Sequence, residues 1–120
     1  MKEFSFEKLN VWQKAKTLAV HIYKITEKFP ERERFGLVSQ LRRCSISVSS
    51  NIAEGTGKNS TKDKARFTEI AYASLMELLN QLIIAYDLSF INKDQYESFR
   101  KDIEEISRML NALRKSQLNS

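Results

Sequence analysis

The residue types that most often carry out chemistry are scarce in this sequence of 120 residues, which has one histidine, His21, and one cysteine, Cys44. Metal sites in helical bundles need several carboxylates with Glu-x-x-His pairs, and zinc sites need further His or Cys ligands. No acid lies one turn beyond or before His21, since Thr17 and Ile25 occupy the positions four residues away. We therefore expect a partly exposed helical histidine, no metal site and no cofactor.

Cys44 is the one candidate for a thiol nucleophile. Such a nucleophile needs a nearby base and surroundings that favour the thiolate. Arg42 and Arg43 precede it and would favour the thiolate. In contrast, the apolar residues Leu41 and Val48 lie one helical turn before and after it and favour a buried thiol. We expect a packed core thiol in a reducing compartment, because a single cysteine cannot build a disulfide framework.

The segment 55–60, Gly-Thr-Gly-Lys-Asn-Ser, has some likeness to a phosphate-binding loop. It lacks the first glycine at the required spacing, follows a helical pattern instead of a strand, and has Asn after its lysine. The serines of residues 45–50 have no histidine at helical spacing. We therefore predict no catalytic residues and no enzyme activity.

Basic side chains are the remaining candidates for a site. Residues 35–62 carry four of them against one acid, Glu54, which we expect to pair with an arginine, and two more follow by residue 66. The predicted contacts to a nucleic-acid phosphate backbone are Arg42, Arg43, Lys58, Lys62, Lys64 and Arg66. The alternative is a solvated helix surface, since a net charge of +5 is modest.

A hydrophobic period of about 3.6 residues recurs in four blocks and predicts the elements that position these side chains. Short connections between amphipathic helices favour antiparallel neighbours. We predict an all-α fold of one domain, 1–120, as an antiparallel up-down-up-down four-helix bundle with helices at about 7–28, 33–55, 60–89 and 93–116.

Local signals predict where these helices begin and end. Gly55 and Gly57 are typical stops for the second helix. In the same helix Ser45, Ser49 and Ala53 form a ridge of small residues, which we expect to lie against the third helix. The predicted N-terminal caps are Asn10 with Gln13, Ser60 with Asp63, and Asn92 with Gln95.

The third helix is apolar around most of its circumference, which indicates that it is covered on more than one side. This predicts a homo-oligomer. No apolar run approaches the ~18 residues of a membrane span, and the charged N-terminus has no signal-peptide core. We expect a cytoplasmic protein with no membrane partner.

Several segments together resemble one bacterial family, the four-helix-bundle proteins encoded in intervening sequences of 23S ribosomal RNA genes. They are LNVWQKA at 9–15, FP at 29–30, GL at 36–37, QLRR at 40–43 and SNIAEG at 50–55. The resemblance covers about residues 6 to 115. This chain departs from the family at Lys58, where arginine is usual, which keeps the charge without bidentate phosphate geometry.

The resemblance implies antiparallel four-helix bundles that assemble into homopentameric rings, with no enzymatic activity. A related group, the accessory variability proteins of diversity-generating retroelements, is associated with a reverse transcriptase and with nucleic-acid binding. We therefore expect a non-enzymatic oligomer that binds RNA or DNA through phosphates without sequence preference. The alternative is a protein-interaction scaffold that docks a nucleic-acid enzyme such as a reverse transcriptase.

Overall fold

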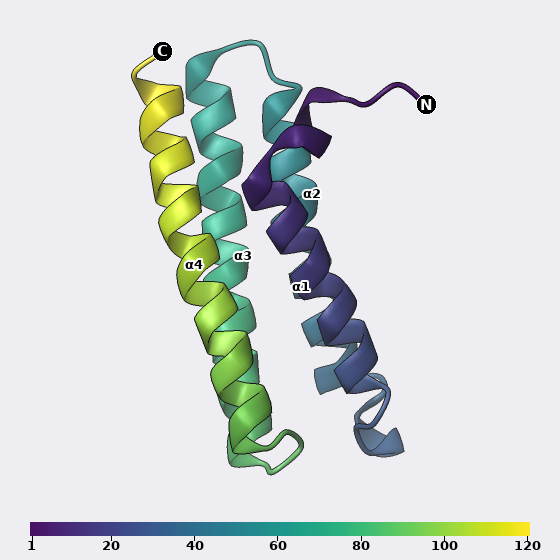
Figure 1. Ribbon diagram of the computed structural model, residues 1–120. Helices are drawn as coiled ribbons and strands as arrows, with labels where there is room; N and C mark the ends of the chain where they lie inside the picture. Colours follow the sequence, from purple (N-terminus) through teal and green to yellow (C-terminus); the bar gives the residue numbers. More distant parts are fainter.

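The computed structural model describes residues 1–120 and has four α-helices and no strand, which confirms the all-α prediction (Figure 1). Consecutive helices run in opposite directions, and the bundle measures 45 × 29 × 21 Å. Two short 3-10 turns, Ser5–Lys8 and Glu31–Glu33, precede the first and second helices. The helices are α1 Asn10–Thr26, α2 Leu37–Thr56, α3 Thr61–Asp87 and α4 Lys93–Leu118.

The apolar stripes that predict the helices form the core. On α3, Leu75, Leu78 and Leu82 are fully buried, as expected for the central residues of the most apolar helix. The stripes of the other helices meet them there. Burial of such side chains contributes roughly 1.5–3 kcal/mol each. The largest buried side chains from the other three helices are Ile22, Leu41, Val48, Ile52, Ile103, Ile106 and Leu110.

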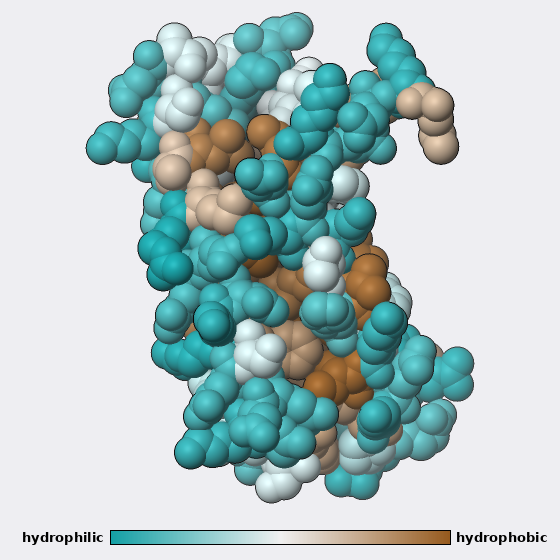
Figure 2. Space-filling view, viewed as in Figure 1, coloured by the Kyte–Doolittle hydropathy of each residue, from teal (hydrophilic) through white to brown (hydrophobic).

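Helix α3 packs along both α2 and α4, whereas α1 packs mainly on α2 and leans away from α4 (Figure 1). Apolar side chains show through the polar surface along the resulting α1–α4 groove (Figure 2). A Lys14–Glu105 ion pair of 2.5 Å bridges it. Hydrogen bonding to Lys14 lowers the pKa of the Glu105 carboxyl, so this contact is lost as the pH falls through that lowered pKa.

Two of the three predicted caps are confirmed. The Ser60 hydroxyl accepts from the backbone N–H of Asp63, and Asn92 forms a capping box with Gln95. The Asn10 cap is wrong, because the 3-10 turn Ser5–Lys8 ends at extended Leu9 and makes Asn10 the first helical residue. The first helix therefore begins three residues later than predicted.

The boundaries of α2 also differ from the prediction. The helix begins at Leu37 and not near residue 33, because Glu31–Glu33 forms its own 3-10 turn after Pro30. Neither Gly55 nor Gly57 has a positive φ, so neither ends the helix in a left-handed conformation. Gly55 is inside α2, where a Cβ atom would stand 3.2 Å from the Phe67 Cβ of α3. Its role is to let the two helices approach.

Within the ridge of small residues in α2, Ser49 faces a different neighbour from the one predicted. Ser49 lines a shallow groove with Val20 of α1. The contact with α3 comes instead from Ser47, whose hydroxyl lies 2.8 Å from that of Ser74, and from Cys44. One residue of helix rotates a side chain by about 100°, so a shift of two positions changes the facing helix.

Ser89 ends α3 in the left-handed region, with φ of 63°. The N–H of Phe90 donates to Ala85 O and that of Ser89 to Tyr86 O, which together form a Schellman motif. A side chain at this position costs about 1 kcal/mol relative to glycine.

We expect Ser89→Gly to raise the unfolding temperature by about 4 °C in a thermal melt. The matched change Ser98→Gly, inside α4, should lower it.

Candidate nucleic-acid interface

The six predicted contact residues fall into two groups that lie far apart. Arg42 and Arg43 are near the start of α2, whereas the others flank the turn between α2 and α3. At 1.5 Å per residue, the helix separates Arg42 from this turn by about 20 Å. The six therefore do not form one patch.

Arg42 joins α1 to α2. Its Nε donates to Thr26 Oγ1 at 2.9 Å and its Nη2 to Tyr23 O at 3.3 Å. The guanidinium also lies 4.7 Å from the centre of the Tyr23 ring. These contacts satisfy the Thr26 hydroxyl and the Tyr23 carbonyl near the end of α1 and use two of the five guanidinium donors, so Arg42 stabilises the fold.

The four residues around the α2–α3 turn differ in how free they are. Lys64 donates from Nζ to Thr56 O at 3.2 Å, and Lys58 Nζ lies 4.7 Å from the centre of the Phe67 ring. Lys62 and Arg66 are exposed and take part in none of the ion pairs or side-chain hydrogen bonds. These two are the side chains best placed to meet a ligand.

Glu54 was expected to pair with an arginine, and this prediction is wrong. The four ion pairs of the structure do not include it, and its backbone oxygen instead accepts from Gly57 N. The basic residues at the turn are therefore not neutralised by the one acid of that segment.

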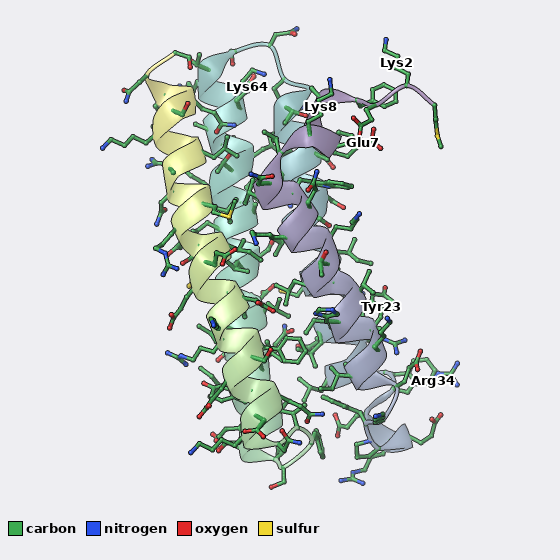
Figure 3. The ribbon with its side chains drawn as sticks, in the orientation of Figure 1. Lys2, Glu7, Lys8, Tyr23, Arg34 and Lys64 are labelled. Atoms are coloured by element: carbon green, nitrogen blue, oxygen red, sulfur yellow. The ribbon has the colours of Figure 1, made fainter.

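The fold adds basic residues that the sequence analysis did not include. Lys2 and Lys8 lie at the same end of the bundle as Lys64 (Figure 3). We call residues 1–8, 54–70 and 111–120 the basic end: they carry eight basic and five acidic side chains, a surplus of three. The opposite end, residues 20–36 and 84–100, carries six of each. Only the packing of the N-terminal segment could reveal this grouping.

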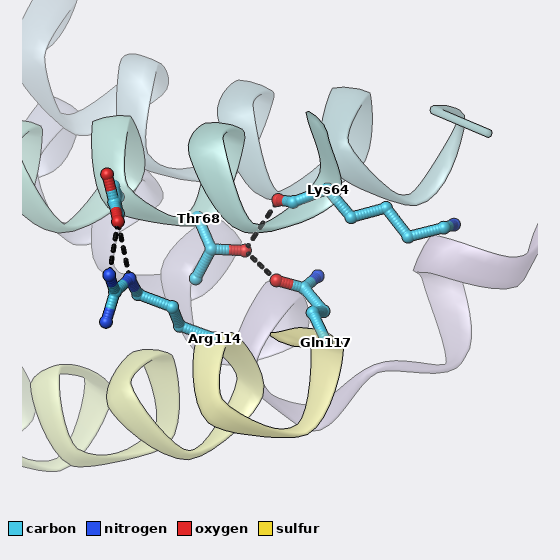
Figure 4. Close-up of polar contacts among 5 residues, drawn as sticks. Lys64, Thr68, Arg114 and Gln117 are labelled. Carbon is cyan, nitrogen blue, oxygen red and sulfur yellow. Dashed lines mark hydrogen bonds and ion pairs between the residues drawn. The ribbon is translucent and has the colours of Figure 1, made fainter. Parts of the chain in front are cut away.

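Contacts between α3 and α4 hold the basic end together (Figure 4). Arg114 bonds to Glu69 Oε1 from both Nη2, at 2.5 Å, and Nε, at 2.6 Å. The Thr68 hydroxyl lies 2.7 Å from Gln117 Oε1 and 3.2 Å from Lys64 O. These bonds keep α4 helical to Leu118 and neutralise Arg114 within the protein.

His21 is exposed in the α1–α4 groove, where two hollows of about 400 and 590 Å³ share it and Asp102. No group of three or more His, Cys, Asp or Glu side chains is placed to hold a metal ion. None of the helices combines the length and apolar character that crossing a membrane requires.

Cys44 is buried as expected, and burial together with a hydrogen bond to Glu77 raises its thiol pKa from 9.0 to about 12. Only the thiolate is strongly nucleophilic.

We expect iodoacetamide at pH 8 to alkylate folded Cys44 about 1,000-fold more slowly than an ordinary cysteine, with normal rates after unfolding in urea. Rapid modification of the folded protein, followed by mass spectrometry, would contradict this.

Comparison with known protein families identifies the family of this chain. Residues 7–112 match the family described as 23S rRNA-intervening sequence protein. The chain belongs to this family.

A solved structure gives the same result for the fold. It is a protein of unknown function from the S23 ribosomal protein family of Bacteroides thetaiotaomicron, with 29% identity and a TM-score of 0.79. The match covers 88% of this chain and 98% of that one. A comparison with curated proteins found no match. The intervening-sequence family resemblance expected from LNVWQKA and SNIAEG is thus confirmed.

Proposed function

We propose that this protein is a non-enzymatic homo-oligomer that binds RNA or DNA through its basic end without sequence preference. The observation that supports this most is the asymmetry of charge: a surplus of three basic side chains at one end and a balance at the other. Lys62 and Arg66 stand there without protein partners. Exposed Lys and Arg side chains bind phosphates and release the counterions that surround them.

A salt series with mixed-sequence single-stranded RNA tests this proposal. With four phosphate contacts per chain, the logarithm of affinity should fall with the logarithm of salt concentration with a slope of roughly −3. Binding that is undetectable at low salt, or that does not change with salt, would contradict the electrostatic interface.

The oligomer is supported by two separate apolar surfaces. At the C-terminal end of α3, Ile84 and the capping residue Leu88 are 43% and 53% exposed. On the α1–α2 side, Val20 and Ile46 are 45% and 43% exposed. Two different patches on one chain fit head-to-tail contacts, which close into a ring when the rotation allows. We propose a homopentamer, in line with the family resemblance.

Light scattering tests the oligomer. The wild-type protein at micromolar concentration should have a mass of several chains, and Ile84→Asp should reduce it, because a buried carboxylate in the interface has no partner. A mass near 14.0 kDa for the wild type would contradict the proposal.

A second candidate function is a scaffold that docks a nucleic-acid enzyme such as a reverse transcriptase. The open α1–α4 groove favours it, since neither the basic end nor the apolar patches of the proposed ring use that surface. Native co-purification with and without nuclease separates the two: a protein partner that survives nuclease treatment favours the scaffold. For either function we propose a reducing cytoplasmic location, supported by the single free thiol.

A further inference from the structure

A pocket of about 490 Å³ lies between α2 and α3, well away from the basic end. Its size is within the range of small-molecule sites, ~300–1,000 Å³. Most of its lining is polar, and it includes Arg43, which the fold separates from the four predicted contacts at the α2–α3 turn. The lining residues that matter here are Phe35, Ser39, Arg43, Cys44, Glu77 and Gln81.

Gln81 is the first sign that this pocket takes a ligand. Its side chain is 7% exposed, and its Oε1 atom is buried with no hydrogen-bond partner. An unsatisfied buried polar atom costs about 1–3 kcal/mol, so native proteins rarely keep one without a reason. A hydrogen-bond donor bound in the pocket would satisfy the Gln81 amide.

Glu77 gives the pocket an oriented carboxylate. Cys44 Sγ lies 3.0 Å from Ser74 O and 3.2 Å from Glu77 Oε2, so the thiol hydrogen is shared between these two acceptors. Glu77 is exposed, and its Oε1 takes part in no hydrogen bond or ion pair within the protein, so it is open to a ligand. Arg43 lines the same pocket but forms no ion pair with Glu77. The pocket therefore has a guanidinium and a carboxylate that do not neutralise each other.

We propose that this pocket binds a guanine base of a single-stranded nucleic acid. The inference rests on the proposed function and adds a preference for one base to phosphate binding at the basic end, which itself has no sequence preference. The Watson–Crick edge of guanine carries N1–H and a 2-amino group. N1–H and one amino hydrogen match the two oxygens of one carboxylate, Glu77, and the second amino hydrogen can be donated to Gln81 Oε1. The base oxygen O6 or the adjoining phosphate then accepts from Arg43. Phe35, which is 89% exposed beside the pocket, offers a face for stacking.

The other bases fit this set of groups less well. Adenine and cytosine each offer one amino group beside an acceptor nitrogen, and that acceptor would face the carboxylate of Glu77. Uracil has a single N–H donor between two carbonyl groups. Guanine alone has neighbouring donors at one side and acceptors at the other, which corresponds to the Glu77 and Arg43 sides of the pocket.

Two short single-stranded RNA probes of equal length test the inference, one containing a single guanine among uridines and the other inosine at that position. Inosine lacks the 2-amino group and so loses one hydrogen bond to Glu77. The wild type should bind the guanine probe roughly tenfold more tightly at fixed salt. Glu77→Gln and Gln81→Leu should each abolish this preference, with folding checked by circular dichroism.

The matched control is Glu104→Gln, which makes the same charge change on the exposed surface of α4 and should keep the full preference. Equal binding of both probes by the wild type, with a normal salt slope, would overturn the guanine pocket and leave the proposed function intact. A preference that persists in both folded pocket variants would overturn it as well. If neither probe binds at low salt, both proposals are overturned.

Discussion

Replacement of Lys62 and Arg66 by glutamine is expected to weaken binding to mixed-sequence single-stranded RNA roughly tenfold at ~100 mM salt. Both side chains are exposed at the basic end and have no ion-pair partner. Each lost phosphate contact should also reduce the steepness of the salt dependence by about 0.7, because fewer counterions are released. Fluorescence anisotropy across a salt series measures both quantities in one experiment.

The control removes the same charge elsewhere. Lys101→Gln with Arg108→Gln neutralises two exposed basic residues of α4 outside the basic end. This variant should retain nearly the wild-type slope, since it loses long-range attraction but no contact. If both pairs of substitutions reduced the slope equally, binding would depend on net charge alone and the basic end would not be the interface.

Gly55→Val is expected to lower the free energy of unfolding by about 2–3 kcal/mol and the unfolding temperature by about 8–12 °C. A Cβ atom at this position would stand 3.2 Å from Phe67 Cβ and 3.4 Å from Lys64 O, so the branched side chain must push α3 away. The displacement also moves Phe67 and Lys64 at the basic end. Thermal melts at one fixed protein concentration measure the effect.

Gly57→Ala provides the comparison two residues further along. There an added Cβ would meet only Glu54 O, at an ordinary 3.5 Å, and φ is −85°, which alanine readily adopts. This substitution should raise stability by about 0.4–1 kcal/mol, because it restricts the unfolded chain. If Gly55→Val were also neutral or stabilising, close packing against α3 would not require glycine at position 55.

The helices and their buried faces could be predicted from the sequence because both depend on local order. The spacing of Leu75, Leu78 and Leu82 places them on one face whatever the rest of the chain does, and all three are fully buried. The caps at Ser60 and Asn92 were equally local. The Asn10 cap failed because the 3-10 turn before it has no comparably strong signal in the residues.

The candidate site could be predicted only in part. Lys62 and Arg66 were found from the density of basic residues in one segment, but the same reasoning included Arg42, whose bonds to Thr26 and Tyr23 depend on how α1 packs on α2. It also missed Lys2, which reaches the basic end through the fold (Figure 3). Charge density along a chain does not reveal which donors the protein itself will use.

By itself the sequence determined that this protein is a bundle of four amphipathic helices with a mild excess of positive charge. Periodicity and net charge are properties of residue order and composition, and they survive any arrangement of the helices. Tertiary structure decided which end of the bundle carries the charge, and that Arg43 shares a pocket with Glu77 and Gln81. Those groupings join residues tens of positions apart, and only the packing of one helix face on another brings them together.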